Sequence, residues 1–103
     1  MQALVLGTAQ WGSPYGVTNG RGRLDDSDLA QIMAAATEAG IDRVDTAAGY
    51  GDSEMRLATW ARGLQITTKV KADSPVSLLA QARACLSQLG VTSVRTLLIH
   101  DWF

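Results

Sequence analysis

The hydrophobic positions of the chain fall into two alternating patterns. Four short apolar runs have the length and aliphatic or β-branched composition of strands. They are expected at residues 3–6, 41–45, 64–70 and 94–100. The three longer segments between them favour helices, and the first has an apolar stripe at the i, i+3, i+4, i+7 spacing. Its members are Leu29, Ile32, Met33 and Ala36. Strands that alternate with helices predict an α/β fold, in which right-handed crossovers join a parallel sheet.

Capping residues and glycines indicate where each helix begins and ends. Residues 25–27 offer a side-chain cap and early negative charge to the first helix, which Gly40 is expected to end. The second helix is expected to begin at residue 52 or 53 and to end at the glycine at 63. Residues 73–75 combine a cap with a proline at the first helical position, and this third helix is expected to end at Gly90.

A long connection at residues 8–24 separates the first strand from the first helix. It contains four glycines and a proline, so no regular element is expected there. Connections of this length in small domains are uncommon and are usually functional. Trp11 and Tyr15 could line a ligand pocket in this segment, or they could shield the end of the core. The sequence leaves both roles open.

A weak internal repeat suits a barrel built from repeated strand–helix units. Residues 40–46 and 90–96 share glycine, apolar, valine and threonine positions at an offset of fifty, the length here of two strand–helix units. Alternate strands of a (β/α)8 barrel occupy equivalent layers, which would produce such a repeat. Chance, or the shared chemistry of helix ends, could also produce it.

Composition narrows the class of protein. Hydrophobic residues make up 47% of the chain and charged residues 18%, as in a globular domain. A formal net charge of −1 gives no sign of a nucleic-acid or anionic-membrane partner. No apolar run approaches the roughly 18 residues of a membrane span. Cys85, the single cysteine, allows no internal disulfide and is expected to be buried, so a cytoplasmic protein is expected.

Polar side chains stand at the carboxyl ends of three successive strands, where ligands bind in parallel α/β folds. They are Asp45, Lys69 and His100, and Tyr50 follows Asp45 by five residues. A neighbouring ammonium lowers the pKa of a phenol, and a carboxylate offsets the cost of burying the ammonium. The set predicts a tuned general acid for carbonyl reduction, with the hydride supplied from elsewhere.

Each of these residues also has a purely structural interpretation. Asp45 could cap a loop, Tyr50 could pack against its neighbours, and Lys69 could be solvated. His100 could form a local pair with Asp101. A metal site made of Asp45, His100 and Asp101 is a weaker alternative, because one histidine and scattered carboxylates are a poor ligand set. No metal site is therefore expected.

Four blocks of sequence resemble the N-terminal part of the aldo-keto reductase family. They are residues 6–12 (LGTAQWG), 44–54 (VDTAAGYGDSE), 66–69 (ITTK) and 97–100 (LLIH). The Asp-Thr-Ala…Tyr-Gly-x-Ser-Glu block is specific, and the other blocks follow in the family's order. The resemblance implies NADPH-dependent reduction of a small aldehyde or ketone. It also implies the first four strands of a TIM-type (β/α)8 barrel, so residues 1–103 would form one partial domain with four strands and three helices.

The resemblance also implies a role for each site residue. Tyr50 would be the general acid, Asp45 and Lys69 the pair that tunes it, and His100 the group that orients the substrate. The nicotinamide end of the cofactor would lie against Asp45 and the segment Gly7, Thr8 and Ala9. The substrate would contact Tyr50, His100 and the candidate pocket walls Trp11 and Trp102.

Three departures from the family shape what is expected of this chain. Ala9 stands where the family often has an aromatic residue, no hairpin precedes the first strand, and the sequence stops after its fourth strand. A complete barrel needs roughly 250 residues. Most cofactor contacts would lie in the other half, so the 103-residue chain alone is expected to bind NADPH poorly and to be weakly active or inactive. The alternative is a non-catalytic half-barrel that self-associates through open sheet edges or serves as an interaction module.

Overall fold

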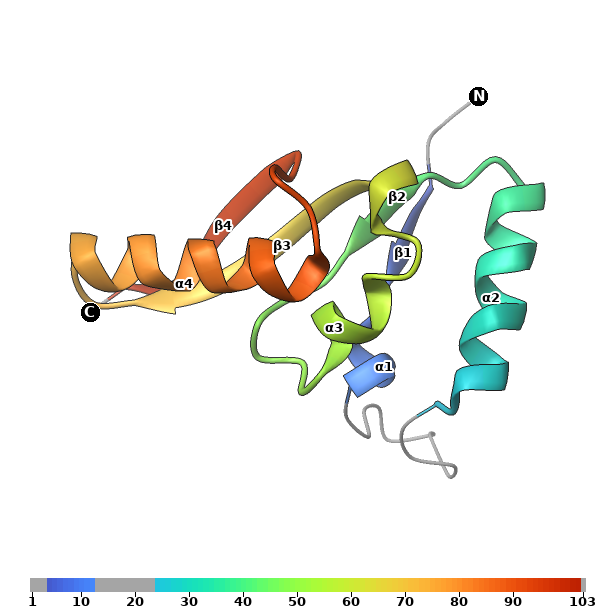
Figure 1. The fold of residues 1–103 in the computed structure, drawn as a ribbon, viewed down its shortest axis with the longest axis horizontal. Coiled ribbons are helices and arrows are strands. Elements are labelled where there is room, and N and C mark those ends of the chain that lie inside the picture. The colour runs from blue at the N-terminus through green and yellow to red at the C-terminus, as the bar shows by residue number, and fades with distance from the viewer. Residues whose placement is uncertain (1–3, 13–23, 103) are drawn as a thin grey trace.

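The computed structural model describes residues 4–12 and 24–102. These residues form a sheet with helices packed on it (Figure 1). In chain order the elements are β1 (Val5–Gly7), α1 (Ala9–Gly12), α2 (Asp26–Glu38), β2 (Arg43–Asp45), α3 (Ser53–Leu57), the 3-10 helix η1 (Ala61–Gly63), β3 (Gln65–Ala72), α4 (Pro75–Leu89) and β4 (Thr96–Trp102).

The sheet has four parallel strands in the order β1-β2-β3-β4, as the sequence pattern predicts. Each strand therefore pairs with the next one along the chain, and a helical connection separates them. Figure 1 shows α2 at one end of the molecule and α4 at the other, with α4 in front of β3, which it contacts. Helix α3 contacts both α1 and α4. The predicted strand–helix alternation is confirmed.

The two long helices begin and end where their capping residues predict. The Asp25 carboxylate accepts a hydrogen bond from the Asp28 N–H at 2.8 Å, and the Ser74 hydroxyl accepts one from the Ser77 N–H at 3.0 Å. Gly90 caps α4 in the left-handed region with a φ of 69°. Such positive φ angles are costly for residues with a Cβ atom, which explains the glycine at this helix end.

The predicted second helix is wrong in its length. Only Ser53–Leu57 is α-helical, and the chain then tightens to bonds between residues three apart, such as Ala58 N–H to Met55 O at 3.3 Å and Trp60 N–H to Leu57 O at 2.9 Å. This 3-10 geometry has three residues per turn, so it changes which side chains face the sheet. Here it brings Ala61 into the core, where 2% of its surface is exposed.

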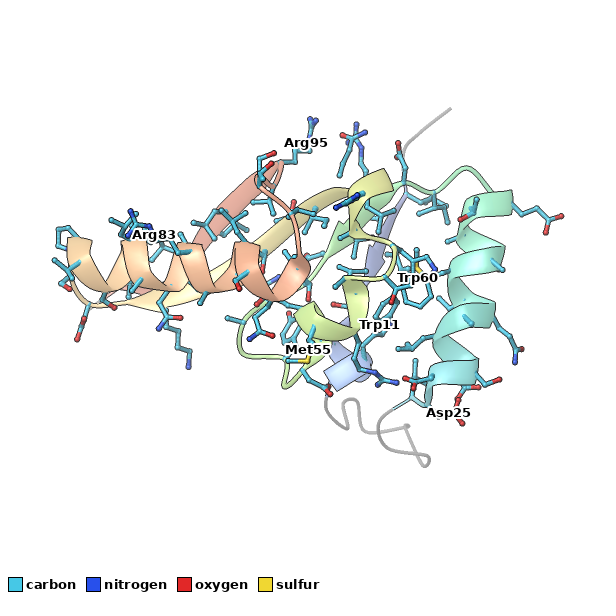
Figure 2. All side chains as sticks on the ribbon, viewed as in Figure 1. Trp11, Asp25, Met55, Trp60, Arg83 and Arg95 are labelled. Atoms are coloured by element: carbon cyan, nitrogen blue, oxygen red, sulfur yellow. The ribbon has the colours of Figure 1, made fainter. Side chains whose placement is uncertain are left out.

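The connection after β1 also differs from its prediction, because Ala9–Gly12 forms the short helix α1. Trp11 explains this turn, since its side chain is only 2% exposed. Its ring packs edge-on against Trp60, with centroids 6.0 Å apart and planes at 76° (Figure 2). Trp11 belongs to the main core cluster, and Trp60 is partly buried against that cluster. Tyr15 and the remainder of that connection lie outside the described residues.

The core lies between the sheet and the helices. Its buried members come from every layer, and Cys85 on α4 is buried as expected, at 2% exposure. The main cluster is Trp11, Leu29, Met33, Val44, Leu57, Ala61, Ile66 and Leu89. Within the described ranges, none of the helices combines the length and apolar composition needed to cross a membrane.

Candidate active site

Two of the predicted polar groups meet directly. Asp45 is the last residue of β2, as predicted, but Lys69 lies within the neighbouring strand β3 and not at its end, because β3 continues to Ala72. The Lys69 Nζ forms an ion pair and hydrogen bond with Asp45 Oδ1. The lysine side chain is 13% exposed and the aspartate side chain 45% exposed. The pair thus has a sheltered cation and a carboxylate that still reaches solvent.

Tyr50 completes this group from the loop that follows β2. The loop folds back on the sheet through two backbone hydrogen bonds, from the Tyr50 N–H to Ala47 O at 3.2 Å and from the Ala48 N–H to Lys69 O at 3.0 Å. As a result the Lys69 Nζ lies 5.2 Å from the centroid of the Tyr50 ring. The structure therefore brings Asp45, Tyr50 and Lys69 together, as the sequence predicts.

The charge of Lys69 follows from these neighbours. Burial, the largest single influence, pushes the pKa of Lys69 down, but the hydrogen bond and charge of Asp45 together with Tyr50 more than offset it. The pKa of Lys69 is raised above its ordinary 10.5. Lys69 is therefore a stable cation at neutral pH beside the phenol.

Two glycines bring the Tyr50 loop against α1. A Cβ atom on Gly12 would lie 1.6 Å from the backbone oxygen of Tyr50, and one on Gly51 would lie 2.1 Å from the backbone oxygen of Gly12. Gly51 also has a φ of +60°, in the region that favours glycine. No other residue type fits either position without moving the backbone. The close contact of the two backbones holds the loop that carries Tyr50 against α1.

The predicted residues on β4 are placed by their backbone alone. The register between β3 and β4 shifts between Val70 and Lys71, whose partners are Ile99 and Asp101. His100 is the extra residue at this irregularity, and Trp102 pairs with Ala72 at the end of the strand. Bulges are over-represented beside active sites, where they redirect a side chain. The side chains of His100, Asp101 and Trp102 lie outside the described residues.

The residues of the predicted cofactor-binding segment, Gly7, Thr8 and Ala9, differ in their exposure to solvent. Gly7 is exposed, is in register with Asp45, and a Cβ atom on it would meet nothing within 4 Å. Thr8 has no exposed surface, and its hydroxyl donates to the backbone oxygen of Asp45 at 3.1 Å. Ala9 is half-buried. Of the two roles left open for Trp11, its burial at 2% exposure favours shielding of the core.

A set of buried polar residues was missed by reasoning on the four charged and phenolic groups alone. They form two hydrogen-bonded groups, one of Thr8, Thr46 and Ser53 and the other of Glu54 and Thr68. Two of them, Ser53 and Glu54, close the specific sequence block that begins at Asp45. A serine and a glutamate directly after a glycine-containing loop are typical of a helix start. Nothing in the sequence therefore indicated that Ser53 and Glu54 would be buried.

Two hollows in the surface differ in their relation to this group. The larger, about 440 Å³, is lined by residues that include Arg62, Gly90 and Thr92, near the starting ends of β3 and β4. It lies away from Asp45 and Tyr50, so its size does not bear on their chemistry. A smaller hollow of about 290 Å³ is bounded by Lys69 and by the loop at Ala47–Gly49.

Comparison with known proteins places this geometry in a family. The family model for the aldo/keto reductase family matches residues 3–103, and the chain belongs to that family. The chain is 38% identical over 89 residues to an aldo-keto reductase from Mycolicibacterium smegmatis, and 36% identical over 89 residues to one from Mycolicibacterium vanbaalenii. Each match covers 79% of the chain but only 31% and 32% of those proteins. The chain thus spans about a third of the length of these relatives.

Solved structures agree on the fold. A crystal structure from Pseudomonas aeruginosa, assigned as an aldo-keto reductase, superposes with a TM-score of 0.84 at 28% identity. It covers 97% of this chain, which corresponds to 43% of that protein. A thermostable aldo-keto reductase solved with the inhibitor epalrestat gives a TM-score of 0.75 at 24% identity, a likeness of fold alone. The predicted fold class, part of a TIM-type barrel, is confirmed.

Proposed function

We propose that this chain carries the proton-donating part of an active site that reduces a small aldehyde or ketone with NADPH. The observation that supports this is the contact of Asp45 at the carboxyl end of β2, Lys69 within β3 and Tyr50 in the loop that follows β2. A phenol beside a lysine that is held charged by a carboxylate is suited to donate a proton. Membership of the aldo-keto reductase family supports the reaction class.

In the proposed reaction, the Tyr50 hydroxyl donates its proton to the carbonyl oxygen of the substrate. The Lys69 ammonium stabilises the phenolate that remains, and Asp45 keeps Lys69 charged and in place. His100 donates a hydrogen bond that orients the carbonyl, and Trp102 lines the substrate pocket. When bound, NADPH supplies the hydride that the carbonyl carbon requires.

The residues present fit the nicotinamide end of the cofactor in part. Gly7 offers an open backbone surface beside Asp45, and Ala9 is partly accessible. The Thr8 side chain is turned into the protein and its backbone is hydrogen-bonded to Asp45 and Trp11, so Thr8 supports this segment without a contact of its own. We propose Gly7, Ala9 and Asp45 as the contacts, with the phosphates held by the part of the barrel outside this chain. The 103-residue chain should therefore bind NADPH weakly in a fluorescence titration, and tight binding would contradict this.

The test of the proposed function is substitution of the acid in the full-length protein that carries this sequence. Tyr50→Phe should lower the rate of NADPH-dependent carbonyl reduction by about a hundredfold or more, the usual worth of a general acid. Lys69→Met should do the same, whereas Arg83→Met, at an exposed position on α4, should leave the rate within about twofold. Unchanged turnover in Tyr50→Phe would exclude Tyr50 as the acid.

A second candidate is a non-catalytic half-barrel that associates with a second copy. The observation that favours it is apolar exposure on the two outer strands and beside them: Leu4 63%, Val5 57%, Leu98 45% and Ile99 46%. Outer strands also present unpaired backbone groups that tend to pair. Sedimentation velocity of the 103-residue chain should then show a dimer that Leu98→Glu dissociates. A stable monomer would count against this candidate.

A further inference from the structure

The start of helix α3 reaches three strands with two adjacent side chains. Ser53 has no exposed surface and Glu54 is 5% exposed, although they open a helix of only five residues. So short a helix has little stability of its own, because nucleating a helix is unfavourable. The hydrogen bonds of Ser53 and Glu54 attach this helix to the sheet.

Ser53 links β1 and β2 through a directed chain of hydroxyls. The Thr8 hydroxyl donates to the backbone oxygen of Asp45 at 3.1 Å, so it must accept from Ser53, whose Oγ lies 2.8 Å away. Ser53 also lies 3.2 Å from the backbone oxygen of Thr8. Since each hydroxyl has one proton, the 3.0 Å contact between Thr46 and Ser53 is donated by Thr46. The chain Thr46, Ser53, Thr8 therefore ends on the backbone of Asp45.

Glu54 makes the corresponding contact with β3. Its Oε2 accepts a hydrogen bond from the Thr68 hydroxyl at 2.7 Å, and Thr68 has no exposed surface. Thr68 directly precedes Lys69. In the described part of the chain, every buried side-chain nitrogen and oxygen has a hydrogen-bond partner. The hydrogen bonds of Ser53 and those of Glu54 are thus each complete, which makes both groups rigid and the loss of any member costly.

The alternation of side chains along a strand relates these contacts to the Asp45–Lys69 ion pair. Successive residues point to opposite faces, so Thr46 and Thr68 face α3 while Asp45 and Lys69 face the other side. Each threonine held by α3 is therefore the direct neighbour of one member of the ion pair. A shift of Thr46 would therefore move Asp45, and a shift of Thr68 would move Lys69, because only one peptide unit separates the residues of each pair.

We propose that Ser53 and Glu54 are positioning residues that hold Asp45 and Lys69 in register beneath Tyr50. Neither touches the reacting atoms; they act through Thr8, Thr46 and Thr68. The proposal rests on the proposed function for its catalytic consequence, but its structural consequence is independent: the Asp45–Lys69 pair should loosen when either side chain is removed.

The test reads the ion pair and the reaction separately in the full-length protein that carries this sequence. The first readout is the titration of Lys69, followed by the NMR signal of its 13C-labelled ε-carbon and assigned by its loss in Lys69→Arg. The second is kcat against KM for carbonyl reduction. The variants are Ser53→Ala, Glu54→Leu, Glu54→Gln and Thr68→Val. Glu38→Leu, at an exposed position, is the matched control.

Ser53→Ala and Glu54→Leu should each lower the titration midpoint of Lys69 and reduce kcat about tenfold with KM within about threefold. Glu54→Gln should restore both, because an amide oxygen still accepts from Thr68. Thr68→Val combined with Glu54→Leu should lose no more than either change alone, as expected for one shared bond. If Glu54→Leu fails to fold, Thr68→Val and Glu54→Gln decide the matter.

A Lys69 midpoint that stays the same in Ser53→Ala and Thr68→Val would overturn the proposal. So would a Glu54→Gln variant as impaired as Glu54→Leu in both readouts. Absence of carbonyl reduction in the unmodified protein, with the Lys69 midpoint still moved by these variants, would refute the proposed function and leave the positioning role standing.

Discussion

The inner and outer strands of the sheet are built differently. Next to β2 and β3 lie the fully buried hydroxyls of Thr46, Ser53 and Thr68 and the buried Glu54. The backbones of Gly12 and Gly51 are in close contact nearby. On the outer strands β1 and β4, by contrast, Val5, Leu98 and Ile99 are about half exposed, at 57%, 45% and 46%.

This difference separates a site that the chain organises with its own residues from two outer strands on which apolar side chains reach the surface. The contact of Asp45, Lys69 and Tyr50 is fixed entirely by residues within the chain. The relatives described above are longer proteins, of which this chain covers 31% to 43%. Changes near the inner strands should therefore disturb the site far more than changes of similar size elsewhere.

The largest effect is expected where the two backbones touch. Gly12→Ala would place a methyl group 1.6 Å from the Tyr50 backbone oxygen, so α1 and the loop must separate. We expect a loss of about 3 kcal/mol in the free energy of unfolding, at the upper end for overpacking. Gly63→Ala is the control, since its Cβ atom would meet nothing within 4 Å, and it should change stability by less than about 0.5 kcal/mol. Urea denaturation measures both, and equal effects would contradict the close contact.

Arg56 should give the next largest effect. Its guanidinium, on a side chain 8% exposed, donates to the backbone oxygens of Trp11 and of Leu24, the latter at 2.7 Å. It thereby ties α3 to the segments before and after residues 13–23. Arg56→Met should cost about 2 kcal/mol of unfolding free energy, because two carbonyls lose a charged donor.

Two controls isolate that contribution of Arg56. Its ion pair with Asp26 involves a carboxylate that is 96% exposed, so Asp26→Asn should cost less than about 0.5 kcal/mol. Arg83→Met changes an exposed arginine that projects from α4 (Figure 2) and should be similarly mild. If Arg83→Met were as costly as Arg56→Met in urea denaturation, the hydrogen bonds of Arg56 to Trp11 and Leu24 would contribute nothing beyond the loss of an arginine.

A smaller effect is expected at Cys85, beneath α3. Burial raises the pKa of the Cys85 thiol to about 12, and the hydrogen bond and charge of Glu54 add to it. Because the folded pKa exceeds the ordinary 9.0, the stability linked to this proton is complete below about pH 9 and is lost as pH rises toward 12. At pH 8 the native thiol should react with Ellman's reagent far more slowly than the urea-unfolded thiol. Equal rates would show that Cys85 is accessible.

Much of this arrangement could be predicted from the sequence, because it depends on local signals. The caps at Asp25 and Ser74 and the stop at Gly90 set the limits of the long helices. The meeting of Asp45 and Lys69 follows from the pairing of neighbouring parallel strands, although β3 continues past Lys69 to Ala72.

What could not be predicted depends on contacts between distant segments. Trp60 leaves the expected helix because Trp11, remote in sequence, provides its packing partner. The buried role of Glu54 depends on Thr68 on another strand, and periodicity does not report such pairs. The prediction that Trp11 lines a substrate pocket came from its place in a glycine-rich connection, a signal that does not distinguish a pocket wall from a buried side chain.

The titration of Lys69 in an Asp45→Asn variant tests the central claim most directly. In the unmodified protein the midpoint should lie above 10.5, because Asp45 and Tyr50 outweigh the effect of burial. The stability linked to Lys69 is then complete below pH 10.5 and is lost as pH rises through the raised value. In Asp45→Asn burial acts without that carboxylate, and the midpoint should fall below 10.5. Asp42→Asn, an exposed control, should leave it unchanged. A midpoint that does not move in Asp45→Asn would contradict the account of the site.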